Sequence, residues 1–587
     1  MKKFSKLLCI CLALSMSACG GGVSNTSSSE SVATSSSNSS IESIFDSSFN
    51  SSSEDSSFSS SSSWESSSSF DSSFDSSFDS SSEDSSFSSS SSWESSSSFD
   101  SSSDSSSDSS STGACSHKDT NDDGTCDRCY TTVAVTFDIF NINDIHGKFA
   151  DGDSQPGVDE LTTYFKNARA KNPNTVLLSS GDTWQGTAEA GLTKGHIFTD
   201  WMNELGFAAM TLGNHEFDWG EKIISENAAV AEFPFLACNI YNVKTNQLAS
   251  YCQPSVMVES SGVQIGIIGA IGDCYSSICA DFTKNITIKT GTQLTSLVKA
   301  ESDKLREQGA DYIIYALHDG NESSYNYETS VSDADMSAYY DISLSQGYVD
   351  LVFEGHTHQN YVLKDSKNVY HLQGGGDNKG ITRAQVTINP YGTDRVNSVE
   401  YVKTSVYSSL NDDPIVEELL EKYQDSVAKA NEVLGTNKTK RTSSVICQLV
   451  ADLYAAKGEE IWSNYDIVLG GGYLKARSPY NIYAGQVLYS HLYMVLPFNN
   501  QLVLCSVKGS DLKSKFINST NSSYYIAYTQ YGNTVKDSIS NSKTYYIVVD
   551  AYTSTYKYNN LTEIARFEQE TYARDLVAEY IKSGKWA

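Results

Sequence analysis

Met210–Gly220, MTLGNHEFDWG, is the stretch that best indicates how this chain folds. The apolar run Ala208–Leu212 predicts a short buried strand, which Gly213 ends. Polar residues follow within a single turn, namely Asn214, His215, Glu216 and Asp218. Ligands of open α/β sheets bind where strands end, so we expect this turn to form part of a binding or catalytic site.

The same pattern occurs at four other places, where a predicted strand is followed by Asp, Asn or His residues. The strands are Val133–Ile142, Thr175–Ser179, Tyr312–Leu317 and Val349–Phe353. The residues that follow them are Asp144, His146, Asp182, His318, His356 and His358. With His215, five of the nine histidines of the chain fall at such strand ends, so we predict one shared polar site.

Apolar strands alternate with helical stretches from Val133 to Pro390. Nearly continuous apolar strands such as Val263–Ile271 are typical of a sheet whose two faces are both covered. Residues 133–390 are therefore predicted to form a layered α/β domain. Its expected helices are Val158–Ala170, His196–Leu205 and Leu294–Gln308.

A second domain of mixed α/β composition is predicted at 434–587. The linker before it, 391–433, contains a charged amphipathic helix at Asp413–Glu432. Within the second domain we expect strands at Ile467–Leu469, Gln501–Val507 and Tyr545–Val549, and helices near Ser443–Lys457 and Glu568–Ser583.

The N-terminal region predicts a targeting signal and a membrane anchor. Lysines precede the short apolar run Leu7–Leu14, which suits a signal peptide over 1–18 and is too short to span a bilayer. Ser17-Ala18-Cys19 is typical of a bacterial lipoprotein cleavage site, so Cys19 is the expected lipid-bearing residue; an ordinary secretory signal is the alternative. Residues 19–112 are mostly Ser with acidic residues, a composition that predicts a disordered stalk. We therefore expect a lipid-anchored protein on the extracellular face of a bacterial cell membrane.

A Cys/His/Asp-rich motif at 113–131 has three alternative structural roles. Cys115, His117, Cys126 and Cys129 have the spacing C-x-H…C-x-x-C, which is compatible with tetrahedral zinc. The acidic run that starts at Asp119 matches the first half of a calcium loop, but its last carboxylate is missing. A disulfide is the third alternative. None of the three would be catalytic.

The composition excludes one class of partner. The net charge of −31, from 41 basic and 72 acidic residues, argues against nucleic acid, whose binding needs a basic face.

The remaining cysteines form no metal pattern. Candidate disulfides among them are Cys238 with Cys252 and Cys274 with Cys279.

The strand-end motifs resemble those of the calcineurin-like metallophosphatases, and more closely those of the 5′-nucleotidase family. The matching signatures are DIHG at 144–147, GDTWQG at 181–186, GNHEFDWG at 213–220, His318 and GHTH at 355–358. The resemblance covers 133–587 and is sharpest before residue 390. It implies a four-layer αββα sandwich for the first domain and a second domain that recognises the substrate.

The resemblance also implies a centre of two divalent ions, zinc, manganese or similar, for which nitrogen and oxygen ligands are suited. One ion would be held by Asp144, His146, Asp182 and His358. The other would be held by Asp182, Asn214, His318 and His356, so that Asp182 bridges the two. His215 and Asp218 would form a dyad that faces the substrate, and metal-activated water would attack phosphorus.

In the second domain the resemblance implies two aromatic rings that clamp a nucleotide base. Pro497-Phe498-Asn499-Asn500 matches the first element, so Phe498 and Asn500 are expected contacts, and Tyr552 is the candidate for the second ring. Arg477 stands slightly later than the Arg of the family pattern, and the Gly-Gly-Asp-Gly-Tyr element after the second ring is absent. The phosphate and ribose contacts are therefore expected to differ from those of the family.

These features predict a dimetal-dependent, 5′-nucleotidase-like phosphohydrolase of extracellular nucleotides. Hydrolysis of 2′,3′-cyclic nucleotides or nucleotide sugars is an alternative within the same enzyme class. A non-catalytic surface adhesin is a further alternative, suggested by the anchor and stalk. The intact ligand positions favour an enzyme. The sequence indicates no protein partner or oligomeric state.

Overall fold

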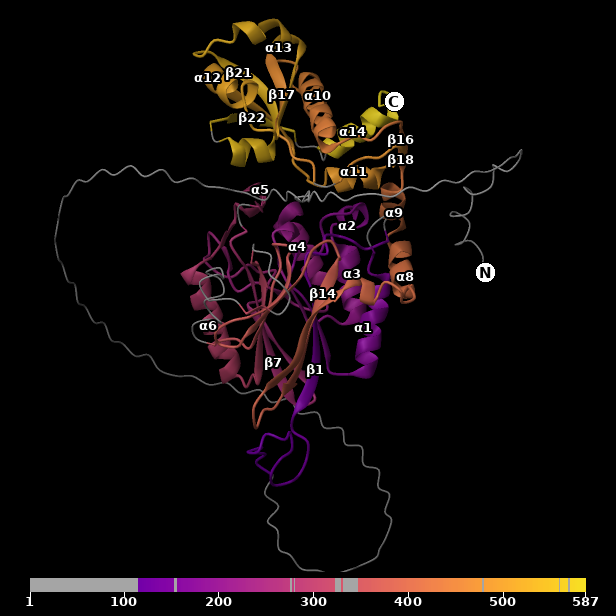
Figure 1. Ribbon diagram of the computed structural model, residues 1–587. Helices are drawn as coiled ribbons and strands as arrows, with labels where there is room; N and C mark the ends of the chain where they lie inside the picture. The colour runs from indigo at the N-terminus through magenta and orange to yellow at the C-terminus, as the bar shows by residue number, and fades with distance from the viewer. Residues whose placement is uncertain are drawn as a thin grey trace, which may run out of the picture. The chain divides into compact units, whose positions relative to one another are not determined.

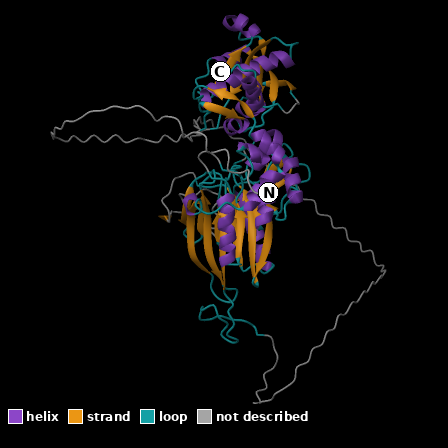
Figure 2. Cartoon of the chain, turned by 90° about the vertical axis from the view of Figure 1, so that its right-hand side faces the viewer, coloured by secondary structure: helices purple, strands orange, loops and turns teal. Residues whose placement is uncertain are grey.

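Two β-sheets form the centre of the first domain in the computed structural model. The structure describes residues 115–151, 156–274, 277–278, 280–321, 329–330, 347–477, 480–558, 560–567 and 571–586. The first sheet has the order β15 (Arg395–Lys403), β14 (Gly380–Ile388), β1 (Val135–Ile142), β2 (Thr175–Ser179), β3 (Ala209–Thr211), β4 (Phe235–Leu236). The second has the order β10 (Thr329–Ser330), β12 (Asn360–Lys364), β13 (Tyr370–Gly374), β11 (Leu351–Phe353), β9 (Tyr312–His318), β7 (Val263–Ile271), β6 (Ser255–Ser260). Figure 2 shows these strands running alongside one another.

The two sheets pack face to face, and helices cover their outer faces. Along β1, Phe137 and Ile139 belong to the apolar cluster between the sheets, whereas Phe140 and Ile142 belong to the cluster beneath the helices. The first sheet is covered by α1 (Asp159–Lys171), α3 (His196–Leu205) and α4 (Glu221–Val230), and the second by α6 (Thr292–Glu307). Figure 1 shows α1 and α6 on opposite sides of the paired sheets. The αββα sandwich is thereby confirmed.

The apolar strand pattern predicted a layered α/β domain whose sheet is covered on both faces, and only the family resemblance implied that the layers are αββα. Each sheet has helices on one face and the other sheet on the second face, so every central strand is still apolar on both sides. Burial alone does not distinguish this arrangement from a single sheet between helices.

Most predicted elements of the first domain occur within two residues of their expected bounds. The helix His196–Leu205 and the strand Val263–Ile271 match fully, and glycines in the left-handed region, Gly195 and Gly206, flank that helix. The predicted linker helix is instead two helices, α8 (Pro414–Lys422) and α9 (Gln424–Ala430). The break falls at Tyr423, whose hydroxyl donates to Asp200 of α3 at 2.6 Å. The break therefore coincides with a contact to the first domain.

A five-stranded sheet forms the centre of the second domain. Its order is β20 (Tyr524–Tyr528), β17 (Ile467–Tyr473), β21 (Thr544–Asp550), β19 (Leu502–Lys508), β22 (Thr562–Arg566). Helix α10 (Ser443–Ile461) packs on one face, and a second apolar cluster fills the other. The remaining helices are α11 (Tyr489–Val495), α12 (Gly509–Asp511), α13 (Gln530–Val535) and α14 (Ala573–Lys582). The predicted strands and helices of this domain are therefore present, α14 being shorter than expected.

Short elements complete the structure. They are α2 (Ala188–Leu192), α5 (Ala280–Thr283), and the strand pairs β5 (Ile240–Asn242) with β8 (Ile286–Ile288) and β16 (Val433–Asn437) with β18 (Gly485–Leu488). The suggested Cys238–Cys252 disulfide is wrong, because both thiols are free and buried. Within the described ranges no helix has the length and apolar character that crossing a bilayer requires. The predicted signal peptide, Cys19, the predicted stalk and Cys279 lie outside those ranges.

Candidate active site

Five strands bring their predicted site residues to one edge of the sandwich. Strands β1, β2, β3, β9 and β11 are followed or ended by Asp144, Asp182, Asn214, His318 and His356, in that order. Of the predicted ligands, Asp144, His146, Asp182, His356 and His358 all have positive φ, between 50° and 68°. Non-glycine residues in that region are strained by about 1–3 kcal/mol each, and such strain is concentrated at functional sites.

One group of donors consists of Asp144, His146 and His358. The Nε2 atoms of His146 and His358 lie 2.9 Å apart. The Oδ1 atom of Asp144 lies 3.4 Å from Nε2 of His358 and 4.0 Å from Nε2 of His146. Asp144 and His146 are buried, and the His358 side chain is 37% exposed. The group therefore opens toward solvent on the His358 side.

A second group surrounds Asp182 and Asn214. Oδ1 of Asn214 lies 3.1 Å from Nε2 of His318 and 2.9 Å from Nδ1 of His356. Oδ2 of Asp182 lies 3.3 Å from Nε2 of His318. Ligand atoms of Asp144, Asp182 and His318 also lie within 4.8 Å of one another, which links the two groups. Asp182 thus has the position that a bridging carboxylate requires.

The donor set fits divalent ions. Nδ1 of His146 lies 3.0 Å from the carbonyl of Gln185, and Nδ1 of His318 lies 2.7 Å from the carbonyl of Ser180. A carbonyl only accepts, so each Nδ1 donates, and Nε2 is the ring nitrogen that faces the site, as in metal-bound imidazoles. Burial, with the charge of Arg477, holds the pKa of His146 well below its ordinary value and keeps this imidazole neutral.

Glu216 was expected only as one of the polar residues of this turn, and the sequence assigned it no role of its own. Its buried carboxylate accepts hydrogen bonds from the backbone N–H groups of Asp182, Thr183 and Gly213 at 2.9, 2.8 and 2.7 Å. It therefore ties the loop after β2 to the loop after β3. Gly213 is required there, because a side chain would collide with the Asp182 carboxylate. Its position inside the GNHEFD motif was the available signal.

His215 and Asp218 form the predicted pair at the start of a short 3₁₀ helix, His215–Trp219. Nδ1 of His215 lies 2.8 Å from Oδ2 of Asp218, and the backbone N–H of His215 donates to Asp182 at 2.8 Å. Burial opposes the charged imidazole, but the carboxylates of Asp218 and Asp182 outweigh it and raise the pKa of His215 to about 9. The ring therefore carries a proton at neutral pH. His215 also lies within 4.8 Å of ligand atoms of His146 and Asp182.

Phe498 of the second domain lies beside this pair. Its ring is 40% exposed and stacks on His215 with a centroid distance of 6.2 Å and an interplanar angle of 24°. The buried guanidinium of Arg574 donates to the carbonyls of Pro497 and Phe498 at 3.1 and 3.3 Å and to the side chain of Asn499. Arg574 therefore positions the loop that presents Phe498, a role that no local pattern in the sequence revealed.

The other predicted substrate contacts are placed differently. Nη2 of Arg477 lies 3.4 Å from Oδ1 of Asp377, so this arginine faces the first domain near the ligand groups. Tyr552 is half-buried and lies beside Tyr473, with ring centroids 6.2 Å apart. Asn500 is half-buried and follows the loop held by Arg574. Of the four predicted contacts, Phe498 and Arg477 have contacts with residues of the first domain.

Cys274 is a neighbour of the ligand groups that was expected only as a disulfide candidate. It is free, and its Sγ lies within 4.8 Å of ligand atoms of His318 and His356. Burial, with the negative charge of Asp319, raises its pKa well above the ordinary value, so the thiol stays neutral. Cys274 follows strand β7 as the ligands follow theirs, and that strand-end position was the missed signal.

Comparison with known families agrees with this geometry. Residues 137–360 match the model of the calcineurin-like phosphoesterases, and residues 426–562 match that of the 5′-nucleotidase C-terminal domain. The chain therefore contains a calcineurin-like phosphoesterase domain followed by a 5′-nucleotidase C-terminal domain. Members of this class use a dimetal centre, and the groups around Asp144 and Asp182 are the candidates for it here.

Individual proteins are similar to the chain in sequence or in fold. It is 25% identical over 418 residues to a 5′-nucleotidase of Diplobatis ommata, covering 64% of this chain and 70% of the relative. It is 29% identical over 287 residues to a 2′,3′-cyclic-nucleotide 2′-phosphodiesterase/3′-nucleotidase of Yersinia enterocolitica, covering 44% and 41%. A 5′-nucleotidase precursor of Thermus thermophilus has the same fold, with a TM-score of 0.54, 18% identity, and coverage of 77% of this chain and 97% of that one.

Proposed function

We propose that this chain hydrolyses the phosphate ester of extracellular nucleoside monophosphates, as a metal-dependent 5′-nucleotidase-like enzyme. The observation that carries the proposal is the position of Phe498, which stacks on His215 at 6.2 Å beside the donor groups. A base that stacks on this exposed ring would have its phosphate within reach of those groups. Stacking tolerates every base, so the arrangement favours nucleotides without selecting one.

The residues of the site have distinct tasks in this proposal. Asp144, His146, Asp182 and His358 would hold one divalent ion, and Asp182, Asn214, His318 and His356 the other. Two such ions polarise a phosphoryl group and lower the pKa of bound water. His215 holds a proton on the side opposite its contact with Asp218 and can donate a hydrogen bond to a phosphate oxygen as charge develops. Arg574 keeps Phe498 in place.

A cyclic-nucleotide or nucleotide-sugar substrate is the second candidate. The relative from Yersinia enterocolitica carries the name of a cyclic-nucleotide phosphodiesterase and 3′-nucleotidase, which favours this alternative. The departure of Arg477 from the family spacing also favours altered phosphate contacts. The third reading, a non-catalytic adhesin, loses its support because the chain contains a phosphoesterase domain and its donor groups are assembled.

Phosphate release from a panel of substrates tests the proposal. The panel contains 5′- and 3′-mononucleotides, 2′,3′-cyclic nucleotides, nucleotide sugars and a small aryl phosphate, each with several divalent metals. We expect the highest kcat/KM with 5′-mononucleotides. A preference for cyclic nucleotides or nucleotide sugars would select the second candidate, and no metal-dependent release from any substrate would contradict both.

Phe498→Ala should raise KM for a nucleoside monophosphate by about tenfold, because stacking of a base on an aromatic ring contributes roughly 1–3 kcal/mol. The small aryl phosphate, which has no base to stack, should keep its KM. Tyr531→Ala is a matched control, since Tyr531 is 39% exposed in the same domain and Phe498 is 40% exposed. If KM rises equally for both substrates in Phe498→Ala, the Phe498 ring contributes to packing and the base is recognised by other residues.

We also propose that the chain is anchored at the extracellular face of a bacterial cell membrane through a lipid on Cys19, on the basis of the sequence of its N-terminal region. In a bacterial host that processes lipoproteins, labelled fatty acid should be incorporated into the wild-type protein and not into Cys19→Ser. Cys11→Ser, which removes a cysteine from the signal segment, should still be labelled. Equal labelling of Cys19→Ser would exclude this cysteine as the anchor.

A further inference from the structure

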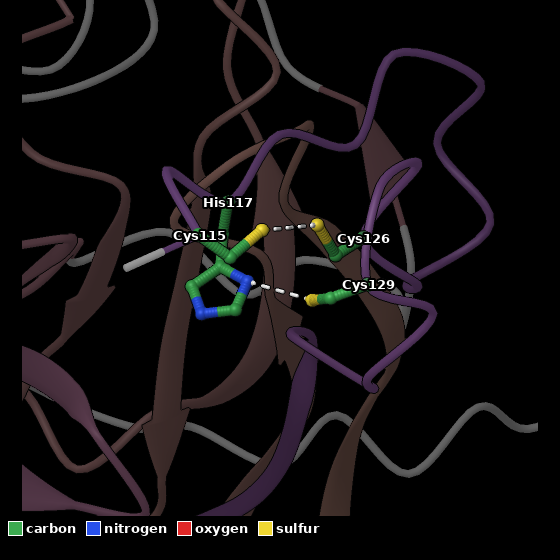
Figure 3. A group of neighbouring side chains, drawn as sticks. All are labelled: Cys115, His117, Cys126 and Cys129. Carbon is green, nitrogen blue, oxygen red and sulfur yellow. Dashed lines mark hydrogen bonds between the residues drawn. The ribbon is translucent and has the colours of Figure 1, made fainter. Parts of the chain in front are cut away.

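Four potential metal ligands converge in the segment that precedes β1. They are Cys115, His117, Cys126 and Cys129, and their ligand atoms all lie within 4.8 Å of one another. Figure 3 shows the three thiols and the imidazole turned toward one another from a tightly folded loop. None of the four contributes to the active site described above. Their convergence therefore calls for a separate explanation.

The distances between the ligand atoms match a tetrahedral zinc site. With zinc–sulfur bonds of about 2.3 Å and tetrahedral angles, two sulfur ligands are about 3.8 Å apart, and a sulfur and an imidazole nitrogen about 3.6 Å apart. Sγ of Cys115 lies 3.7 Å from Sγ of Cys126, and Sγ of Cys129 lies 3.3 Å from Nδ1 of His117. Three cysteines and one histidine are also a common ligand set of structural zinc sites.

Cys126 is the buried member of the group. It has no exposed surface, and its backbone carbonyl accepts the N–H of Tyr130 at 2.9 Å across a turn in which Tyr130 has a φ of 59°. This short turn contains both cysteines of the C-x-x-C pair, Cys126 and Cys129, and both contribute a thiol to the group.

The two alternatives from the sequence are less compatible with this arrangement. All three thiols are free. Asp119 was expected to begin a calcium loop, but its carboxylate accepts hydrogen bonds from the N–H groups of Asp123 and Gly124 at 3.2 and 2.7 Å. The Asp123 carboxylate accepts a hydrogen bond from the N–H of Thr125 at 2.9 Å. These carboxylates therefore serve as turn acceptors. The thiols and imidazole are left as the convergent donors.

The same loop contacts the catalytic domain at the end of strand β1 opposite to the active-site residues. Nδ2 of Asn389 donates to Asp119 at 2.7 Å, and the N–H of Thr393 donates to Asp122 at 2.9 Å. The His117 ring lies 5.3 Å from that of Tyr391. These partners lie in the turn between β14 and β15, beside the beginning of β1, whereas Asp144 follows its end. Eight residues of strand separate the two sites by about 26 Å.

We propose that Cys115, His117, Cys126 and Cys129 bind one structural zinc ion. The bound ion holds residues 115–134 in a folded loop, and this loop packs against the turn between β14 and β15. Because a loop this short has little apolar surface to bury, the ion supplies most of its stability. The zinc site is independent of the active centre and of the substrate.

Metal analysis of the full chain tests the proposal. Wild-type protein, purified without chelators, should contain one more zinc ion per chain than the variants His117→Ala and Cys126→Ser. The phosphatase activity of both variants should equal that of the wild type. His117→Cys keeps a four-ligand set and should retain the ion. Cys447→Ser, a buried thiol in α10, is the matched control and should also retain it.

Cobalt substitution gives a second readout, which begins with the wild-type chain. Cobalt(II) in the wild-type chain should show a near-ultraviolet thiolate-to-cobalt charge-transfer band, and the predicted active-centre ligands, all nitrogen and oxygen donors, do not produce one. The band should disappear in Cys126→Ser and persist both in Cys447→Ser and in Cys274→Ser, whose thiol lies beside the predicted active-centre ligands. Equal zinc in wild type and His117→Ala, a cobalt-loaded wild type without this band, or a Cys115–Cys126 disulfide recovered by mass spectrometry would each overturn the proposal. Stoichiometric calcium that is lost in Asp119→Asn would assign the loop to calcium instead.

Discussion

Asp182→Ala should lower kcat/KM for every phosphoester by about 10⁴-fold or more, because both ions of a dimetal centre would lose a shared ligand. Oδ2 of Asp182 lies 3.3 Å from Nε2 of His318. A carboxylate oxygen of Asp182 also lies within 4.8 Å of a ring nitrogen of His146, which belongs to the other group. Chelation of the wild-type enzyme should have the same effect, and added zinc or manganese should restore the wild type only.

The control for Asp182→Ala is the metal-free wild type, whose thermal melting temperature shows how much stability the loss of metal alone removes. Asp182 also accepts the backbone N–H of His215 at 2.8 Å, so some loss of stability is expected in addition to the loss of metal. Asp303→Ala removes an exposed carboxylate from α6 and should leave activity and metal content unchanged. Full activity in metal-stripped wild type would contradict the metal-dependent mechanism.

The strand-end pattern could be recognised from the sequence because its chemistry is local. Asp, Asn and His directly after an apolar strand are unusual together, and five strands of the sandwich end at the same edge. The helix His196–Leu205 was also predicted with its observed bounds, and glycines in the left-handed region flank it. The face-to-face pairing of the two sheets could not be predicted from the strand pattern. Central strands are apolar on both sides whether a second sheet or a layer of helices covers them.

Contacts between distant parts of the chain account for most of what the sequence did not reveal. Arg574 lies 76 residues beyond Phe498, and the hydrogen bond between them depends on how α14 packs. Tyr423, at the break between α8 and α9, contacts Asp200, more than two hundred residues earlier. Stacking of Phe498 on His215 joins the two domains. Such pairs carry no periodicity, so local patterns do not predict them.

His215→Asn should lower kcat and kcat/KM together by about 10²–10⁴-fold, because a charged imidazole that donates to the phosphate contributes mainly to the transition state. Both metals should remain bound. Metal content is the decisive measurement, since His215 lies within 4.8 Å of ligand atoms of His146 and Asp182 and is therefore close enough to be a ligand itself. Loss of one ion in this variant would assign His215 to the metal centre.

A double-mutant cycle then separates the roles of the pair. Asp218 acts through His215, which it contacts at 2.8 Å, so Asp218→Asn should reduce kcat less than His215→Asn does. The variant with both substitutions should be no slower than His215→Asn alone, because the carboxylate has no separate contact with the phosphate in this mechanism. Additive losses would show that Asp218 acts on the reaction independently, and the assignment of Asp218 as a positioning residue would then be wrong.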